Sequence, residues 1–450
     1  MKYSEVFTKP QPRNLNEVRF LTQNFQNEFN RILSINKIEA ISFAESFFHQ
    51  FPFQRHLSKS MAYLFRDEMG FSSGYRKLIK IFVDVTQHLS MIGRSVYNLP
   101  PIFENTYSME RIGEMVEQTA VACQAQRLGV LDTKPILLLP NSEYLANKGF
   151  LPYLANTFEI VSDSAEVSLF EKLSHIIPYF GQATKITDEI YGAGAETLPK
   201  LNRLLKKMGK RSSSFQLLDE TIDKATSFLN SYDLDLKKPF VTFHIREAGF
   251  IDVTETNKLR NCNINEYILS IEWLLKQGIQ VVRIGHKKMA QIDKKKGLID
   301  LTKVQRPGEV DIYLCGKNLF FYGSHSGPSD IAHQFGAPTL ITSAMDYSSA
   351  YDNMLIEFQP MRRIEDKSLI KFSEILNSEL RLSHSPVPFR RAFLEPVKIS
   401  EQTHLKSVKE MLELLNNGGI INMNHKYNEK KVNVNIPIDT YLTSSSLTLL

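Results

Sequence analysis

The sequence predicts a mixed α/β protein in which two domains follow a helical N-terminal region, and three observations carry this prediction. The chain has 450 residues, which is enough for two domains and a smaller helical part. Its composition, 42% hydrophobic and 23% charged, is that of a globular protein rather than a disordered one. From residue 91 onward, strand-sized apolar runs alternate with helical patterns. Such alternation predicts mostly parallel sheets, because helices make the crossovers between parallel strands.

The first ninety residues predict helices. Phe43, Phe47 and Phe51 recur close to helical spacing, and the stretch from Gly70 to Gly74 interrupts the pattern before another apolar-periodic segment. We interpret the phenylalanine stripe as core packing. Residues 1–90 are therefore set apart as a helical N-terminal region.

Residues 91–230 predict the first α/β domain. Pro135–Leu139 and Phe158–Val161 have the composition of short strands, and helical patterns lie before and after them. The polar stretch around Ser212–Ser214 and Asp233–Asp235 indicates the junction with the next domain.

A basic helix is predicted at residues 200–211, near the end of the first domain. This segment has no acid, and its cations are Lys200, Arg203, Lys206, Lys207, Lys210 and Arg211. Leu201, Leu204, Leu205 and Met208 recur there at helical spacing. We favour a surface helix with a solvated charged face. The alternative is peripheral contact of residues 200–211 with an anionic membrane surface.

Residues 231–395 predict the second α/β domain, where the pattern is clearer. Strands are expected at 240–245, 279–284, 319–322 and 339–342, with a helix at 265–276 and another after Ser326. Residues 396–450 predict a C-terminal helix and a tail that packs back on the N-terminal domain. Within this tail, residues 432–435 alternate Val and Asn and suit a late strand or a strap.

Glycines and basic side chains follow two of these strands. The first strand leads into His244, Arg246 and Gly249, and the second into Arg283, Gly285 and His286. Ligands of a parallel sheet bind at the carboxyl ends of its strands. An arginine there can direct two donors onto a phosphate, or pair with a nearby acid.

The third strand end has the most specific pattern. Gly323 and Ser324 are followed by a helix start, with Ser326 as the N-cap, Pro328 in the first turn and Gly336 at the end. Free N–H groups at a helix start bind anions, and a diphosphate fits them well. A capped helix without a ligand is the plainer interpretation, but three such strand ends at one edge favour an anion site.

Several classes of function lack their motifs. The chain has no Gly-x-x-x-x-Gly-Lys-Ser/Thr loop and no His-Glu-x-x-His zinc motif, and the stretch from Gly323 to Gly327 has histidine, not serine, at its middle position, so it is not a nucleophile elbow. Asp233-Leu234-Asp235 precedes a strand, and we interpret it as a turn, so we expect no metal and no cofactor. The net charge of +5 is small for a nucleic-acid-binding protein, and no nucleic-acid partner is expected.

The cellular location is predicted from three absences. The three cysteines are too widely spaced for a disulfide framework, no apolar run approaches the ~18 residues of a membrane span, and no signal-peptide pattern is visible. We therefore expect a cytoplasmic protein, with the inner face of the membrane as the alternative location.

In order and spacing, these residues resemble a family of bacterial glycosyltransferases related to the GT-B fold. The likeness covers residues 235–345 and runs through His244-Ile245-Arg246, Arg260-Asn261, Arg283-Ile284-Gly285, Ser326-Gly327 and Phe335-Gly336-Ala337-Pro338. The His-x-Arg element is also similar to that of fucosyltransferases that use GDP-fucose, whose arginine contacts the β-phosphate of the donor.

The resemblance implies two Rossmann-like domains facing a cleft, with an acceptor-side domain over 91–230 and a nucleotide-sugar domain over 231–395. The implied donor-phosphate residues are His244, Arg246, Ser326, Gly327 and Pro328. The nucleotide would contact Arg283, Gly285, His286, Asp300, Asp311, Gly323 and Ser324. On the acceptor side, the residues near strand ends are Asn141, Asn147 and Tyr153.

The implied reaction is metal-independent transfer of a hexosyl or deoxyhexosyl group from a nucleotide-diphosphate sugar to a glycan, lipid-linked or protein acceptor, in cell-surface glycan biosynthesis. The candidate bases nearest in sequence are Glu247, Asp252 and His325. We prefer Glu247, which stands where the family has aspartate. Two alternatives stay open, namely a sugar-nucleotide epimerase of the same fold and a non-catalytic module that binds sugar or nucleotide.

Overall fold

The computed structural model describes residues 102–103, 109–131, 133–139, 141–167, 197–249, 260–345, 353–382, 386–419 and 441–450, with scattered positions between 24 and 46 that are mainly helical. The chain forms two compact units. The first contains residues 1–104, 133–140 and 161–193, and the second contains 105–132, 141–160 and 194–450. These units group the chain differently from the predicted ranges 1–90, 91–230, 231–395 and 396–450, whose boundaries stay a prediction.

A small sheet has the strand order β1-β2-β3. Its strands are β1 (Ile102–Phe103), β2 (Ile136–Leu138) and β3 (Glu159–Val161), and β1 and β2 are parallel, with Ile102 opposite Ile136. The last two strands lie where the sequence predicts them. All three residues of β2 are buried, which is why this strand is a continuous apolar run.

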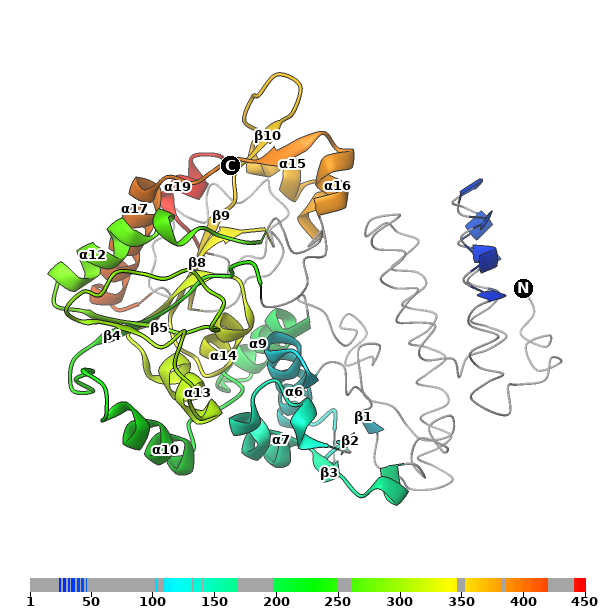
Figure 1. Ribbon diagram of the computed structural model, residues 1–450. Coiled ribbons are helices and arrows are strands. Elements are labelled where there is room, and N and C mark those ends of the chain that lie inside the picture. The colour runs from blue at the N-terminus through cyan, green and yellow to red at the C-terminus, as the bar shows by residue number, and fades with distance from the viewer. Residues whose placement is uncertain are drawn as a thin grey trace. The chain divides into compact units, whose positions relative to one another are not determined.

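Seven parallel strands form the large sheet of the second unit (Figure 1). In spatial order they are β12 (Tyr441–Leu442), β9 (Met354–Phe358), β8 (Thr339–Ala344), β7 (Phe320–Ser324), β4 (Phe240–His244), β5 (Gln280–Arg283) and β6 (Leu298–Asp300). The mixed α/β prediction is confirmed, and the four strands predicted in this part of the chain are β4, β5, β7 and β8.

The chain enters this sheet in the middle, at β4. It continues through β5 to β6 on one side and then passes to β7, β8 and β9 on the other. This is the strand order of a Rossmann sheet, which binds its ligand where the order reverses. The reversal in this chain lies between β4 and β7.

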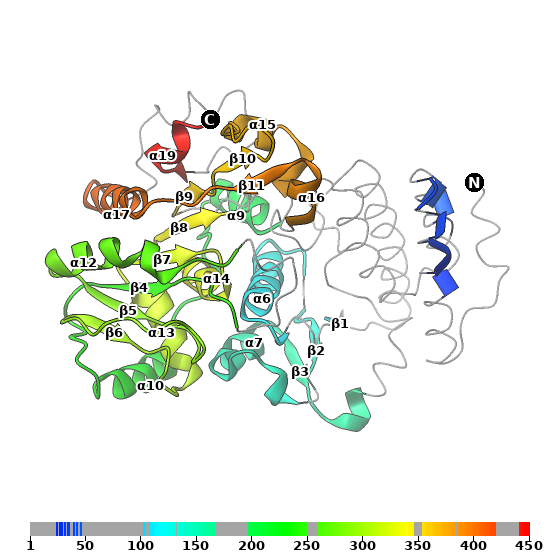
Figure 2. The same cartoon turned by 45° about the horizontal axis from the view of Figure 1, so that its top comes forward.

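Helices cover both faces of the large sheet (Figure 2). On one face, α12 (Ile268–Lys276) packs on α17 (Glu401–Asn416), and on the other α13 (Gly308–Lys317) packs on α14 (Gly327–Gln334). Every residue of β4, β5, β7 and β9 is buried as a result. Phe243, Tyr267 and Tyr322 form an aromatic cluster in the core beside α12, with ring centroids 5.3 to 5.7 Å apart.

Further helices of the second unit pack around α13 and α14. They are α6 (Ile112–Arg127), α7 (Leu151–Thr157), α9 (Thr197–Lys207) and α10 (Asp219–Leu229). The short 3-10 turns are η2 (Ser142–Tyr144), η3 (Lys148–Phe150), η4 (Ile264–Glu266) and η5 (Glu379–Leu382). α6 packs on α14, α9 on α6, and α10 on α13.

The predicted basic helix is α9. Its residues Leu198, Leu201 and Leu205 are 0 to 1% exposed, whereas Lys206 and Lys207 are exposed. The leucine face is therefore part of the protein interior. Peripheral membrane contact of residues 200–211 stays a prediction, and among the described residues no helix combines the length and hydrophobicity needed to cross a bilayer.

The C-terminal residues complete the second unit. β10 (Met361–Arg363) pairs antiparallel with β11 (Leu394–Pro396), near α15 (Phe372–Leu376) and α16 (Pro386–Arg391). The last ten residues form β12 and α19 (Ser444–Leu447), and the Thr443 N–H donates to the Ile356 carbonyl at 2.9 Å. The tail thus extends the large sheet beyond β9, while residues 432–435 lie outside the described residues.

Candidate functional site

Three strand ends meet beside the reversal of the large sheet. His244 at the end of β4 lies opposite Gly323 of β7, and Phe243 lies opposite Arg283 at the end of β5. Because the strands are parallel, the loops that follow all three leave from the same edge. The sequence predicts a ligand site at this edge.

Gly323 permits a close approach between β4 and β7. A Cβ atom at this position would lie only 1.6 Å from the carbonyl oxygen of His244, and the residue has φ of 153°. Only glycine fits so near another backbone. The chain leaving β4 is therefore held directly against the loop that precedes α14.

The backbone of Arg246 is fixed on two sides. Its N–H donates to Ser324 Oγ at 2.7 Å, and its carbonyl accepts from the Cys262 N–H at 2.8 Å. Arg246 thereby lies between the end of β7 and the segment 260–262. Ser324, predicted to contact the nucleotide, is 2% exposed and holds the chain of Arg246 through its side chain.

The Arg246 guanidinium is partly buried near two other arginines. Burial, with a further contribution from the positive charges of Arg260 and Arg111, lowers the pKa of Arg246 to about 10. The group still carries its charge at neutral pH. Like charges in a partly desolvated place repel one another, and an anion bound there would relieve that repulsion.

α14 begins at the same edge. Ser326 is its N-cap and Pro328 is in its first turn, as the sequence predicts. The Ser326 N–H donates to Ser329 Oγ at 2.9 Å, while Ser326 Oγ is buried and has no hydrogen-bond partner among the described residues. A helix start carries partial positive charge, so an anion is favoured beside it.

The first turns of α6 and α14 touch through two glycines. A Cβ on Gly327 would lie 2.8 Å from Ile112 Cβ, and a Cβ on Gly113 would lie 2.7 Å from Asp330 Oδ2. The buried Asp330 carboxylate therefore lies where two helix N-termini meet, and both helix dipoles stabilise its negative charge.

His325 is held in place by its neighbours. Its Nε2 lies 3.3 Å from Asp330 Oδ1, and the two side chains are 19% and 11% exposed. The carbonyl of His325 accepts from the Arg260 guanidinium at 3.1 Å. A carboxylate beside one ring nitrogen orients an imidazole.

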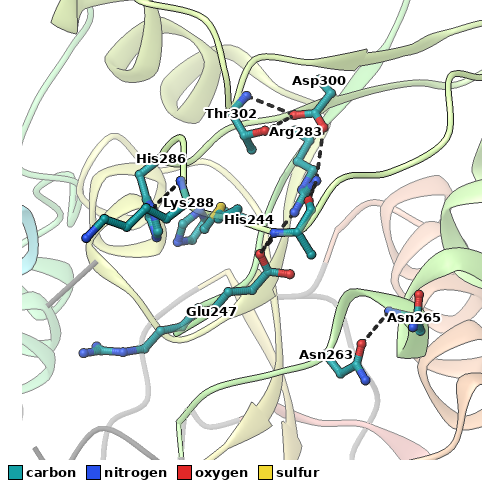
Figure 3. Close-up of polar contacts among 12 residues, drawn as sticks. His244, Glu247, Asn263, Asn265, Arg283, His286, Lys288, Asp300 and Thr302 are labelled. Carbon is teal, nitrogen blue, oxygen red and sulfur yellow. Dashed lines mark hydrogen bonds and ion pairs between the residues drawn. The ribbon is translucent and has the colours of Figure 1, made fainter. Parts of the chain in front are cut away.

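A second cluster lies around Arg283, which is buried at the end of β5. Figure 3 shows this arginine between two acids: its guanidinium lies 3.1 Å from Asp300 Oδ2 and 3.3 Å from Glu247 Oε2. The Glu247 carboxylate also accepts from the Ala290 N–H at 2.9 Å. Burial raises the pKa of Glu247, and these two partners oppose the increase.

The remaining residues predicted to contact the nucleotide lie on the loop after β5, at the end of β6 and in the first turn of α13. Asp311, in the first turn of α13, receives two hydrogen bonds from Arg306, at 2.7 and 3.2 Å, and Arg306 also donates to the Gly285 carbonyl at 3.1 Å. Asp300 Oδ1 accepts from the Thr302 N–H at 2.9 Å. The Lys288 N–H lies 3.3 Å from His286 Nδ1. These contacts hold the loops against the sheet.

His244 is buried and neutral. Burial lowers its pKa to about 4, and its Nδ1 donates to the Ile284 carbonyl at 3.0 Å. The imidazole can therefore act only as a neutral group at physiological pH. It lies at the end of β4, two residues before Arg246, and the role of the His-x-Arg element stays a prediction.

The three predicted acceptor-side residues lie elsewhere in the second unit. Asn141 and Asn147 cap η2 and η3, and the Asn147 amide also donates to the Gly308 carbonyl at 3.1 Å. The Tyr153 hydroxyl lies 2.9 Å from Thr221 Oγ1, in an aromatic cluster with Phe215. These contacts give each residue a structural role, and the acceptor role stays a prediction.

Two further expectations concern acids and metals. Asp252, a candidate base, lies outside the described residues. Within the part of the chain that the structure describes, no group of three or more His, Cys, Asp or Glu side chains is arranged to hold a metal ion. Metal independence is still a prediction about the reaction.

Three residues beside Arg246 and α14 are absent from the sequence-predicted site: Arg111, Arg260 and Asp330. Arg260 belongs to the segment that resembles the glycosyltransferase family, and this was the one signal that could have found it. Arg111 is 135 positions before Arg246, so no local pattern connects them. Asp330 has the position of an ordinary first-turn acid, and no sequence motif marks its pairing with His325, five positions earlier.

No protein-family model and no curated protein matches the chain. Solved structures that match include the glycosyl transferase family 9 protein from Veillonella parvula DSM 2008, with 15% identity, a TM-score of 0.33, and coverage of 73% of this chain and 86% of that one. Another is E. coli ADP-heptose lps heptosyltransferase II, with 11% identity, a TM-score of 0.28, and coverage of 75% and 97%. These likenesses are distant, and the function proposed below rests on the residues of the site.

Proposed function

We propose that this protein is a glycosyltransferase that takes a sugar from a nucleotide-diphosphate sugar and transfers it to a glycan, lipid-linked or protein acceptor. The observation that carries the proposal is the hydrogen bond from the Arg246 N–H to Ser324 Oγ, two residues before the N-cap of α14, at the reversal of the sheet. Sheets of this type bind nucleotides at that place. Ser326, Gly327 and Pro328 supply the helix start, and Arg246 supplies the charge.

The chemistry of glycosyl transfer matches this arrangement. As the sugar leaves, negative charge grows on the diphosphate, and the enzyme must offer fixed positive groups at that position. A guanidinium and a helix start can do so without a metal ion, and we include metal independence in the proposal. The charge near Arg246 is already concentrated before any ligand binds.

His325 is the candidate base that we carry forward. It lies directly before α14 and is oriented by Asp330, so that it could accept a proton from an acceptor hydroxyl. Glu247 is adjacent to Arg246 in sequence, but its carboxylate is engaged by Arg283 and the Ala290 N–H. A base role for Glu247 would require those contacts to be broken.

Replacing Arg246 tests the proposal. We expect Arg246→Ala to weaken binding of the cognate nucleotide diphosphate about a hundredfold, because a charge-assisted hydrogen bond contributes about 2–3 kcal/mol. Its backbone contacts to Ser324 and Cys262 need no side chain, so the melting temperature should change little. Calorimetry against UDP, GDP, ADP and dTDP measures the affinity, and Arg362→Ala, on β10, is the control.

Equal nucleotide affinity of Arg246→Ala and the unaltered protein would contradict the proposed site. A product assay with excess EDTA then distinguishes the alternatives. A transferase needs an acceptor and keeps its activity in EDTA, an epimerase alters the donor sugar without an acceptor, and a binding module does neither. Complete loss of activity in EDTA would contradict metal independence.

A further inference from the structure

Residues 260–262 connect both halves of the proposed phosphate site. The Cys262 N–H donates to the Arg246 carbonyl at 2.8 Å, and the Arg260 guanidinium donates to the His325 carbonyl at 3.1 Å. The same short segment therefore holds the chain that leaves β4 and the loop that precedes α14. Arg260 is therefore placed where it could bind the same ligand as Arg246 and the loop before α14.

Arg260 differs from the other half-buried or buried arginines at these strand ends. Arg283 is paired with Glu247 and Asp300, and Arg306 is paired with Asp311. Within the described residues, Arg260 forms no ion pair with an acid, and its one hydrogen bond goes to a neutral carbonyl. A guanidinium has five N–H donors in a planar fork, so most of its donors are left for another partner.

Groups next to Arg260 also favour the binding of an anion. Arg260 and Arg246 are near enough for the charge of one to affect the other. Ser326 Oγ, at the start of α14, is buried and unpartnered among the described residues. One phosphate group can be gripped by one arginine and a helix start, whereas a second arginine is best matched by a second phosphate.

We propose that Arg260 binds the donor as a second phosphate residue beside Arg246, so that the site selects a diphosphate over a monophosphate. This inference rests on the proposed function for the nature of the donor. It predicts that sugar donors with a single phosphate, such as CMP-linked sugars, are poor ligands. It also gives the segment 260–262 a role in selecting the substrate class.

Inorganic pyrophosphate and orthophosphate are suitable probes, because they test the phosphate site without knowledge of the base. With the full-length protein in calorimetry, we expect pyrophosphate to bind about tenfold or more tightly than orthophosphate. Arg260→Gln should weaken pyrophosphate binding by about tenfold and orthophosphate binding by less than about threefold. The control is Arg362→Gln. It removes an arginine on β10 that is paired with Glu395 on β11, and it should change neither the pyrophosphate nor the orthophosphate affinity.

Equal losses for both anions in Arg260→Gln would overturn the assignment, because they would indicate a general charge effect. Unchanged pyrophosphate affinity would overturn it as well. If Arg260→Gln does not fold, Arg260→Lys provides the same test, since an ammonium keeps the charge and loses the planar fork. If the protein prefers pyrophosphate but turns over no sugar nucleotide, the proposed transferase function is contradicted and the role of Arg260 is not. If it turns over a sugar nucleotide but binds pyrophosphate and orthophosphate equally well, the role of Arg260 is contradicted and the transferase function is not.

Discussion

His244 carries no charge in the folded protein at neutral pH, because burial lowers the pKa of its imidazole to about 4. The unfolded chain has a histidine pKa of about 6.5. Between these two values, protons bind to the unfolded chain and not to the folded one. The stability that this residue contributes is therefore complete above pH 6.5 and decreases as the pH falls toward 4.

We expect this single residue to remove about 3 kcal/mol from the free energy of unfolding as the pH falls through that window. Urea unfolding at pH 7.5 and at pH 4.5, in the unaltered protein and in His244→Asn, measures the contribution. The variant should lose less stability on acidification than the unaltered protein. The same loss in both would show that His244 is not protected from protonation.

Gly323 is a second residue whose replacement has a predictable effect on stability. Gly323→Ala places a Cβ atom 1.6 Å from the His244 carbonyl oxygen, so β4 and β7 must separate. We expect a loss of at least about 3 kcal/mol in the free energy of unfolding, measured by denaturant titration. Gly278→Ala is a matched control, because its φ is 76° but nothing lies within 4 Å of the added carbon. Its loss should be about 1 kcal/mol.

Arg246 and Glu247 show what sequence can predict about single residues. The strand pattern and the resemblance both identify Arg246 as a residue at the strand end. Successive side chains of an extended chain point in opposite directions, and Glu247 accordingly meets Arg283, which is 36 positions later. Nothing in the local pattern names that partner, because it depends on the pairing of β4 with β5.

Among the elements, η3 is held against α13 by one amide. Asn147 Oδ1 accepts from the Gly149 N–H at 2.9 Å, and its Nδ2 donates to the Gly308 carbonyl at 3.1 Å. A Cβ atom on Gly308 would lie 2.0 Å from Asn147 Oδ1. The Asn147 side chain therefore fits only because residue 308 has no side chain. Both polar ends of the amide are thus engaged between two elements.

Asn147→Ala should therefore lower stability and leave donor binding unchanged. We expect a loss of about 2 kcal/mol, since a cap and a buried partner are both lost. Asn141→Ala removes an exposed cap from η2 and should cost about 1 kcal/mol or less. Thermal unfolding and donor calorimetry measure the two effects. A large change in acceptor KM in a fully stable Asn147→Ala would instead support the predicted acceptor role.

The sequence locates some elements much better than others. β4, β5, β7 and β8 are apolar runs of four to six residues, and their signal is local. β12 has two residues and exists because it pairs with β9, about 85 positions earlier, so its own composition says little. The pairing of His404 in α17 with Glu357 in β9, at 2.8 Å in the core, is equally invisible without the fold.

At the scale of the whole molecule, the basic segment at the end of α9, residues 206–211, is exposed, and a membrane surface is the alternative partner predicted for it. Lys206, Lys207, Lys210 and Arg211 are exposed, and so is Met208 at 54%. Leu198, Leu201 and Leu205 of α9 are buried, so contact with a membrane would be mainly electrostatic, and each cation would contribute about 1 kcal/mol on an anionic surface.

Membrane contact, the alternative to a solvated face, predicts sedimentation with vesicles that contain phosphatidylserine at low ionic strength, and release by salt. The favoured solvated face predicts that the protein stays in the supernatant. Vesicles of phosphatidylcholine alone should not retain the protein. Replacing Lys206, Lys207 and Lys210 with glutamine should abolish the sedimentation. Retention that resists salt, or that survives the triple replacement, would exclude this segment as the electrostatic contact.

The division of the chain into units is the property that sequence patterns reveal least. Residues 105–132 and 141–160 belong with 194–450, while 133–140 and 161–193 belong with the N-terminal part. Composition marks junctions along the chain, such as the polar stretch near 212, but it does not show which distant segments contact one another. α6 contacts α14 at Gly113 and Gly327. Glycine has no side chain, so the sequence gives no apolar pattern that would predict this contact.

The placement of β12 has a consequence for how copies of this protein behave together. β9 is buried along its whole length and apolar except for Glu357, and β12 pairs with its outer edge through Tyr441 and Leu442. Without β12, the backbone N–H and C=O groups along this edge of β9 would lack partners, and a strand from another protein molecule could pair with them. Pairing with β12 leaves a strand of only two residues at this end of the described sheet, which offers fewer backbone groups to a neighbouring chain than the five-residue β9 would.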